Sequence, residues 1–257
     1  MKPRQRIRGT FFKMKEEIPD LSEFDVLIGF AGWGNVGYYS VNHLVETLKL
    51  ETFAAWGNSS WFYKGRLESI VTVYIHETSK TLLVASRVPI PVTSVNPQNW
   101  DEFATELLSW NCKRYIIVGG IREETRAPDN SDWVAYAPNF SYTQKFGVQR
   151  TFGERLAMVG PLSSFLVIGT SLQIPVMGLL AYCNYEEDPE ASTLILSEFK
   201  EIVGQEITGP LKGFDHSFVP IQQGSTHTHE TIEAIFQEDE DEVEEEDFDG
   251  FDPDDLL

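Results

Sequence analysis

The sequence predicts an α/β fold, a three-layer sandwich with a mixed central sheet flanked by helices. Short apolar runs of strand length alternate with longer segments that carry apolar residues at helical spacing. The runs are continuously apolar, which is typical of strands covered on both faces. Two of them, 69–76 and 81–86, are separated by only four residues. This spacing predicts a hairpin, and therefore a sheet that is not purely parallel.

The apolar runs predict six strands, bounded mostly by residues that end strands, such as Gly, Pro, Asn and Ser. The expected ranges are 25–30, 51–56, 69–76, 81–86, 115–119 and 175–182. An aromatic cluster comes after the second of these strands and is expected to pack in the core or at a subunit interface. Its members are Trp56, Trp61, Phe62 and Tyr63.

The first two expected helices follow the first and fourth strands. The earlier helix shows one apolar face at the i, i+3, i+4, i+7 spacing. That face consists of Val41, Leu44, Val45 and Leu48. The second helix opens at Asn96 and Pro97, a capping residue followed by the residue favoured at the first helical position.

Two further helices are expected near the last strand. Residues 162–172 belong to a stretch without charge, between Arg155 and Glu186. They predict a buried helix, which Pro175 separates from a buried strand. The fourth helix opens at Asp188 and ends at Gly204, a residue that commonly terminates helices.

Charge divides the chain into three parts. Of the net charge of −20, residues 230–257 hold −15, which leaves −5 for residues 1–229. We expect a basic N-terminal arm over 1–22, an α/β domain over 23–229, and an acidic tail over 230–257. The tail is too acidic and too poor in apolar residues to pack, so it is expected to be disordered. The polar segment 121–152 is expected to be a long insertion or a partner-facing loop.

Composition excludes several classes of function. An acidic chain repels phosphate, which argues against nucleic-acid binding. The uncharged stretch is interrupted by Pro and Gly, so no membrane span is expected. Cys112 and Cys183 form no C-x-x-C pair and no secretory signal is seen, which favours the cytoplasm. The glycosylation sequons at Asn58 and Asn139 are then chance matches.

A glycine-rich turn after the first strand resembles a dinucleotide-binding loop. Gly32, Gly34 and Gly37 have G-x-G-x-x-G spacing, and a helix is expected to follow. However, no acidic residue ends the second strand and no lysine follows Gly37, while the bulky Trp33 would crowd a phosphate. We therefore interpret the turn as a structural motif. A nucleotide or small-molecule enzyme using it remains the alternative.

Other chemistry is weakly indicated. His227, His229 and Glu230 lie together, but their spacing does not place two histidines on one helical face. The sequence contains no H-E-x-x-H, C-x-x-C or G-x-S-x-G motif. We therefore expect no metal, no cofactor and no catalytic residues.

Three segments, taken in order, carry a family resemblance. They are 28–50 with its Gly34-Asn35-Val36-Gly37 motif, 81–121, and 160–207. Together they resemble the proteasome assembly chaperone family, typified by the eukaryotic second assembly chaperone and its archaeal homologues. The resemblance implies a nucleoside-phosphorylase-like α/β fold and a non-enzymatic, archaeal-type oligomer, formed alone or with a paralogue. Such proteins bind α-subunits of the 20S proteasome and promote its assembly or activity. Some archaeal relatives are described as ATP-grasp enzymes, which makes an ATP-grasp-like or phosphorylase-like enzyme the alternative function.

The end of the chain departs from the family pattern. Certain members end in a hydrophobic-tyrosine-any tripeptide that docks between α-subunits, whereas this chain ends in Asp254-Asp255-Leu256-Leu257. The tail either lodges on a basic surface such as the rim of an α-ring or only keeps the protein soluble. If it docks, the candidate partner-binding residues are Phe248, Phe251, Leu256 and Leu257.

Overall fold

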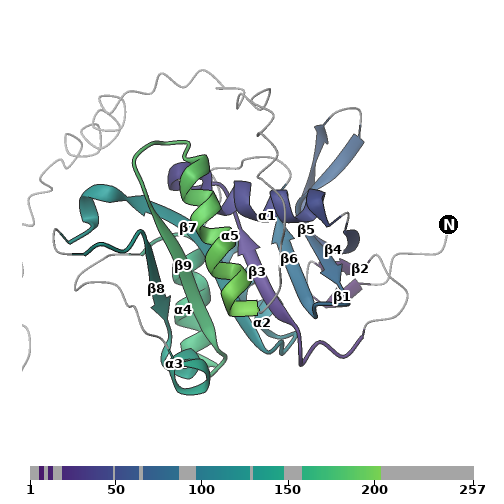
Figure 1. The fold of residues 1–257 in the computed structure, drawn as a ribbon. Helices are drawn as coiled ribbons and strands as arrows, with labels where there is room; N and C mark the ends of the chain where they lie inside the picture. Colours follow the sequence, from purple (N-terminus) through teal and green to yellow (C-terminus); the bar gives the residue numbers. More distant parts are fainter. Residues whose placement is uncertain are drawn as a thin grey trace, which may run out of the picture. The chain divides into compact units, whose positions relative to one another are not determined.

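A mixed β-sheet forms the centre of the part of the chain that the structure describes (Figure 1). The computed structural model describes residues 6–8, 11–13, 19–48, 50–63, 66–86, 97–127, 130–147 and 158–203. Within these residues, nine strands are hydrogen-bonded in the order β1-β2-β4-β5-β6-β3-β7-β9-β8. All of them lie in one compact unit, Met1–Phe214.

The elements follow the chain in an alternating order. The strands are β1 (Arg6–Arg8), β2 (Phe11–Lys13), β3 (Asp25–Gly29), β4 (Glu51–Tyr63), β5 (Arg66–His76), β6 (Thr81–Ala85), β7 (Arg114–Arg122), β8 (Val134–Pro138) and β9 (Val176–Cys183). The α-helices are α1 (Val36–Thr47), α2 (Pro97–Leu108), α3 (Phe140–Phe146), α4 (Pro161–Ser171) and α5 (Pro189–Val203). Two short 3-10 helices are η1 (Trp33–Asn35) and η3 (Glu123–Thr125).

The sheet is parallel in its centre and antiparallel toward its edges. β3 pairs in parallel with both β6 and β7, and β7 pairs in parallel with β9. β5 pairs antiparallel with β4 and β6, and β8 pairs antiparallel with β9. The predicted hairpin is therefore confirmed as the β5–β6 connection through 77–80, and the mixed character of the sheet is confirmed with it.

Helices cover both faces of the sheet, as the sequence predicted (Figure 1). On one face, Phe103 of α2 and Phe165 of α4 pack edge to face, with ring centroids 5.7 Å apart, over side chains of β3, β5, β6 and β7. On the other face, α1 and α5 pack over the alternate side chains of the same strands. The likeness to nucleoside phosphorylases stays a prediction.

Two strands from within residues 1–22 extend one edge of the sheet. β2 pairs antiparallel with β4, with Phe11 opposite Trp56, and β1 pairs with β2. The seven strands from β4 to β8 in sheet order form the main sheet. Residues 204–257, which include the acidic tail, lie outside the described residues, as does the segment from 87 to 96.

The second strand is longer than predicted. β4 continues from Glu51 to Tyr63, so the aromatic residues expected after the strand belong to it. The prediction ended the strand at Trp56 because turn-forming residues follow. In the structure the pairing with β5 shifts register between Trp56 and Ser60, which is how a bulge absorbs such residues without ending a strand.

Segment 121–152, which was predicted to be a long insertion or a partner-facing loop, contains regular elements that the sequence analysis did not predict. β7 extends to Arg122, and the segment also contains η3, β8 and α3. β8 is a short edge strand whose backbone is satisfied by β9, from Val134 opposite Ala181 to Pro138 opposite Met177. Its five residues are too few to show a clear alternation in sequence, because tertiary pairing rather than local preference forms the strand.

The uncharged helix is only partly buried, which corrects the prediction for 162–172. α4 buries Phe165 completely, and Gly169 lets it approach Val176 of β9 closely. Its outer face carries Val167, which is 62% exposed, and Leu172 follows at 52%. β9, in contrast, is buried along its whole length, as predicted.

Candidate functional site

The glycine-rich turn joins β3 to α1 at the carboxyl ends of the parallel strands. Gly34 and Asn35 adopt left-handed backbone conformations, with φ of 65° and 49°. Asn is one of the few residues besides glycine that visits this region readily. The backbone conformation of the turn is therefore accommodated by the Gly-Asn pair.

Close packing explains two of the three glycines. A Cβ on Gly37 would collide with the carbonyl oxygen of Val118 in β7. A Cβ on Gly34 would lie 2.5 Å from Sγ of Cys183 in β9. A Cβ on Gly32, in contrast, would meet nothing within 4 Å. Gly34 and Gly37 thus let the turn and α1 pack directly on β7 and β9.

The loop between β9 and α5 ties down the same turn. The backbone N–H of Asp188 donates to the carbonyl oxygen of Gly34 at 3.0 Å. The carboxylate of Asp188 accepts hydrogen bonds from the backbone N–H groups of Ala191, at 3.0 Å, and of Asn184, at 3.1 Å, and so caps α5. Burial and the nearby carboxylate of Glu187 raise the pKa of Tyr39 on α1. Carboxylates therefore lie at the start of α1, where a bound phosphate would be repelled.

Trp33 and Cys183 complete this packed end. The guanidinium of Arg122 lies over the indole of Trp33, 4.4 Å from the ring centroid. Burial raises the pKa of the Cys183 thiol to about 12, with the charge of Asp188 adding to the effect. A neutral, buried thiol behaves as a small apolar side chain, and here it fills the space that glycine leaves at position 34.

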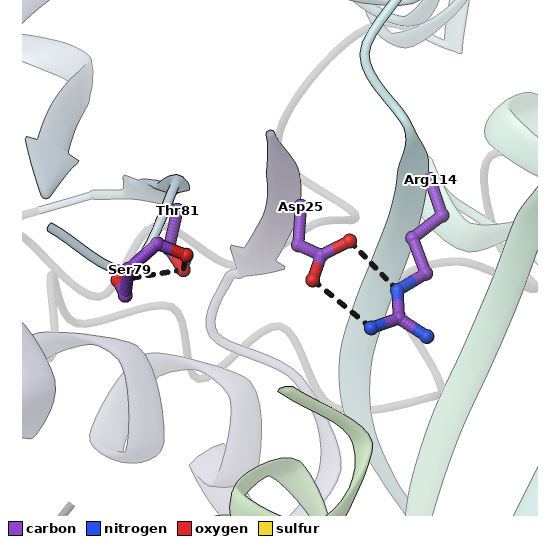
Figure 2. A network of polar contacts seen from close by, with 4 residues as sticks. All are labelled: Asp25, Ser79, Thr81 and Arg114. Atoms are coloured by element: carbon purple, nitrogen blue, oxygen red, sulfur yellow. Dashed lines mark hydrogen bonds and ion pairs between the residues drawn. The ribbon is translucent and has the colours of Figure 1, made fainter. Parts of the chain in front are cut away.

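At the opposite end of the strands, Asp25 of β3 and Arg114 of β7 form a buried ion pair (Figure 2). The two residues are register partners, and the guanidinium Nε and Nη2 donate to the two carboxylate oxygens at 2.7 and 2.9 Å. Burial alone would lower the pKa of Arg114, but the hydrogen bond and charge of Asp25 raise it. The pair therefore fixes the starts of the two strands.

Neighbouring hydrogen bonds make this end rigid. Ser79 donates to the hydroxyl of Thr81 at 2.9 Å, beside Asp25 on the next strand (Figure 2). The hydroxyl of Tyr115 donates to the carbonyl oxygen of Leu107 at 3.0 Å and accepts from the backbone N–H of Cys112 at 3.1 Å. These bonds hold the turn between α2 and β7 in place.

Asn139 fastens α3 to the first residue of β9. Its side-chain oxygen accepts from the backbone N–H of Tyr142 at 2.9 Å, which caps α3, and from Val176 N–H at 3.2 Å. Its side-chain nitrogen donates to the carbonyl oxygen of Ile174 at 2.8 Å. One buried amide therefore positions α3 against the segment that leads into β9.

A groove of about 830 Å³ opens beside this framework. It lies between α3, the end of α4 and the turn before β7, and its described lining includes two lysines and no carboxylate. The lining residues are Ser22, Asn111, Cys112, Lys113, Phe140, Ser141, Gln144, Lys145, Thr170, Leu172, Gln173, Ile174 and Pro175. A second, smaller hollow of about 280 Å³ lies at the other end, beside Arg126 and Asn184.

The predicted site residues do not gather in the groove. Gly32, Gly34, Asn35 and Gly37 lie at the opposite end of the strands. The candidate partner-binding residues Phe248, Phe251, Leu256 and Leu257 fall outside the described residues, as does the His227–Glu230 group. Sequence reasoning missed the groove because its walls come from separate segments, none of which carries a motif.

Two further findings concern the described residues alone. No three His, Cys, Asp or Glu side chains among them come together in a way that could hold a metal ion. None of the described helices combines the length and the apolar composition that a bilayer crossing requires.

Comparison with known proteins decides the family. The model of the PAC2 family matches residues 26–211, which is most of the chain. The chain belongs to the PAC2 family. This result agrees with the resemblance seen in the sequence to the proteasome assembly chaperones. A search of the curated proteins gave no match.

Solved structures agree with this fold for the PAC2 protein. Pyrococcus furiosus PbaA, an archaeal homologue of proteasome-assembly chaperone, is 16% identical, with a TM-score of 0.61 over 76% of this chain and 88% of its own. Pyrococcus furiosus PbaB, an archaeal proteasome activator, is 19% identical, with a TM-score of 0.56 over 90% and 99%. A Mycobacterium tuberculosis proteasome-assembly chaperone homologue is 17% identical, with a TM-score of 0.51 over 82% and 100%. At these identities the likeness concerns the fold.

Proposed function

We propose that this PAC2 protein is a non-enzymatic chaperone or activator that binds 20S proteasome α-subunits and promotes proteasome assembly or activity. Membership of the PAC2 family over residues 26–211 carries the proposal. It is supported by the structures of an archaeal chaperone homologue and an archaeal proteasome activator, which share the fold over most of their own length.

The geometry of the two sheet ends supports a binding scaffold over a nucleotide enzyme. At the carboxyl ends, Gly34 and Gly37 are in contact with β9 and β7, and Asp188 closes the turn with a backbone hydrogen bond. A phosphate-binding loop needs free backbone N–H groups and a positive potential, whereas Glu187 and Asp188 bring carboxylates to this turn.

We also propose that the protein works as an oligomer, with copies of itself or with a paralogue, in the cytoplasm. The outer face of α4 supports this proposal, because it is uncharged and exposes Val167 and Leu172. Exposed apolar residues that cluster on one helix are typical of protein contacts. Sedimentation velocity of the full chain should show an assembly that Val167→Glu weakens; a monomer at all concentrations would contradict it.

The decisive experiment is co-purification with recombinant proteasome α-subunits from the same source. We expect the full chain to retain α-subunits, and a chain that ends at Gln237 separates the role of the tail from that of the folded domain. Loss of binding only on truncation would assign recognition to Phe248, Phe251, Leu256 and Leu257. If neither chain binds α-subunits, the proposed function is wrong.

A further inference from the structure

The groove beside α3 carries positive charge on a chain that is acidic as a whole. The net charge of the chain is −20, yet the charged residues in the described lining are Lys113, on the turn before β7, and Lys145, on α3. Neither lysine forms an ion pair with another described residue. Asp20 and Glu23 flank Ser22 in sequence but are not part of the lining. Carboxylates of a ligand would therefore meet two lysines and no carboxylate of the described lining.

The same groove exposes two large apolar side chains. Phe140, the first residue of α3, is 70% exposed, and Leu172, just after α4, is 52% exposed. Both belong to the lining, although they come from separate elements. A large apolar side chain of a ligand that packs on them would remove apolar surface from water. The groove thus suits a ligand that carries both carboxylates and an apolar group.

Three carboxamide side chains also belong to the lining, those of Asn111, Gln144 and Gln173. Within the described part of the chain, none of these three amides has a hydrogen-bond partner. Each carboxamide both donates and accepts hydrogen bonds, as does each peptide group of a polypeptide backbone. A small anion such as phosphate mainly accepts them. The lining therefore fits an extended polypeptide segment better than a small anion.

The backbone at two of these amides supports a binding role. Asn111 and Gln173 have left-handed conformations, with φ of 54° and 58°. At the end of α4, the N–H groups of Gln173 and Ile174 donate to the carbonyl oxygens of Thr170 and Gly169 at 3.2 and 2.9 Å. In this pattern the position of Gln173 is usually glycine. The chain thus keeps a side chain at the groove where glycine would cost less.

Buried hydrogen bonds hold the walls of the groove in place. Asn139 fixes α3 to the segment that leads into β9. Tyr115 fixes the turn that carries Lys113. A preformed site loses little conformational freedom on binding, so weak individual contacts suffice for docking.

We propose that this groove docks an extended acidic segment of another protein, one that carries a large apolar side chain among its carboxylates. The carboxylates face Lys113 and Lys145. The apolar side chain packs against Phe140 and Leu172, and the backbone of the segment forms hydrogen bonds with the carboxamides. A nucleic acid fits less well, because two lysines offer its phosphates few contacts on a chain of this net charge. The docking goes beyond the proposed binding of α-subunits and does not depend on it.

The test adds the peptide Glu-Glu-Gly-Phe-Gly-Glu-Glu to the isotope-labelled full-length protein. We expect the backbone amide NMR signals of Asn111, Gln144 and Gln173 to shift in a saturable way at up to about 1 mM peptide. The shifts should weaken at about 0.5 M NaCl, where the Debye length falls to about 4 Å. Control peptides with Gln for every Glu, or with Ala for Phe, should bind at least about threefold more weakly.

A charge-reversed groove provides the matched variant. Lys113→Glu/Lys145→Glu should abolish the shifts, because the carboxylates of the peptide would then face carboxylates. Lys200→Glu, on an exposed lysine of α5, makes a change of the same kind away from the groove and should preserve them.

Gln173→Gly tests the groove with a variant that is expected to fold. Glycine adopts the left-handed conformation without strain, so we expect the midpoint of thermal unfolding to rise by about 2–4 °C. The same change removes one carboxamide, so the affinity for the peptide should fall about threefold to tenfold. A rise in stability with unchanged affinity would show that Gln173 takes no part in docking and would contradict the proposal.

Four further results would overturn the proposal. They are no shift at about 1 mM peptide, equal shifts with the Gln-substituted peptide, larger shifts with an oligonucleotide or inorganic phosphate than with the peptide, and an equal loss in Lys200→Glu. Binding to a chain that ends at Gln237 but not to the full chain would also contradict it, because the groove would then be reserved for the protein's own acidic end. Co-purification with α-subunits is read separately, so either proposal can fail without the other.

Discussion

The two ends of the parallel strands in this PAC2 protein differ in how tightly the segments around them are packed. At the carboxyl ends, where α/β folds usually bind their ligands, the glycine turn is packed against β7 and β9 and tied by Asp188. At the amino ends, a rigid framework around Asp25 and Arg114 borders a groove of about 830 Å³. The glycine turn is thus packed shut, whereas the hollow left at that end among the described residues is the smaller one, of about 280 Å³.

The largest expected effect tests the framework at the amino ends. Asp25→Ala leaves the buried guanidinium of Arg114 without its partner, so we expect a loss of about 3–5 kcal/mol in the free energy of unfolding. Urea denaturation measures it. The double variant Asp25→Leu/Arg114→Met removes both charges and should recover much of the loss. A loss below about 1 kcal/mol for Asp25→Ala would show that the pair does not hold this end together.

The next effect tests the closed end. Gly37→Ala forces a Cβ into the carbonyl oxygen of Val118, so we expect about 3 kcal/mol of destabilisation. Gly32→Ala is the matched control, since a Cβ there meets nothing within 4 Å, and it should change stability by no more than about 0.5 kcal/mol. Equal effects at the two glycines would contradict the packing role of the turn.

Asn139 provides a smaller test at the open end. Asn139→Ala removes the cap of α3 and the bonds to Ile174 and Val176, so we expect a loss of about 2 kcal/mol. Hydrogen exchange should show α3 opening before the sheet does. Asn184→Ala, at the opposite end on an exposed residue, should stay within about 0.5 kcal/mol. If the amides of α3 keep the same protection from hydrogen exchange in Asn139→Ala, Asn139 does not hold α3 in place.

Each end of the sheet holds one buried cysteine, and the pKa values of the two thiols can be compared. Burial raises the pKa of Cys112, beside the groove, and of Cys183, beside the turn, to about 12 from 9.0. Because the folded state holds these protons, the stability they contribute is complete below about pH 9 and falls as pH rises toward 12. Native thiols should react with a disulfide reagent at pH 8 only as fast as the protein unfolds. Rapid reaction of either cysteine in folded protein would contradict its burial.

The last prediction is that nucleotide ligands leave the thermal stability of the protein unchanged. A ligand at 100 times its dissociation constant would stabilise the protein by about 2.7 kcal/mol. Because the glycine turn is closed, we expect thermal unfolding to be unchanged by ATP, NAD or nucleosides. A rise in the midpoint that Gly32→Ala abolishes would revive the nucleotide-enzyme alternative.

Most of the framework could be predicted from the sequence because it depends on local signals. The apolar runs that became β3, β6 and β9 are buried strands, and Pro189 and Pro161 lie at the first positions of their helices. β8 and α3 were missed because their stability comes from pairing with β9 and from the three hydrogen bonds of Asn139. No local pattern carries that information.

The candidate site could be predicted only in part. Gly34 and Gly37 gave a readable motif, since glycine at close contacts leaves a recognisable spacing. The groove gave none, because Lys113, Phe140 and Leu172 become neighbours only when α3, α4 and the turn before β7 meet. The exposure of Val167 could not be predicted for the same reason. An uncharged helix is predicted to be buried, but which of its faces is buried depends on the elements packed against it.

The buried amide of Asn139 also bears on how the protein can be produced. Asn139-Phe140-Ser141 is an acceptor sequence for N-glycosylation, but in the folded chain its nitrogen is bonded to Ile174 and shielded from solvent. In a secretory host the unfolded chain would present this nitrogen to the glycosylation machinery first. A glycan attached there would occupy the nitrogen that donates to the carbonyl oxygen of Ile174, so occupancy at this sequon would report the fraction of chains modified before they folded.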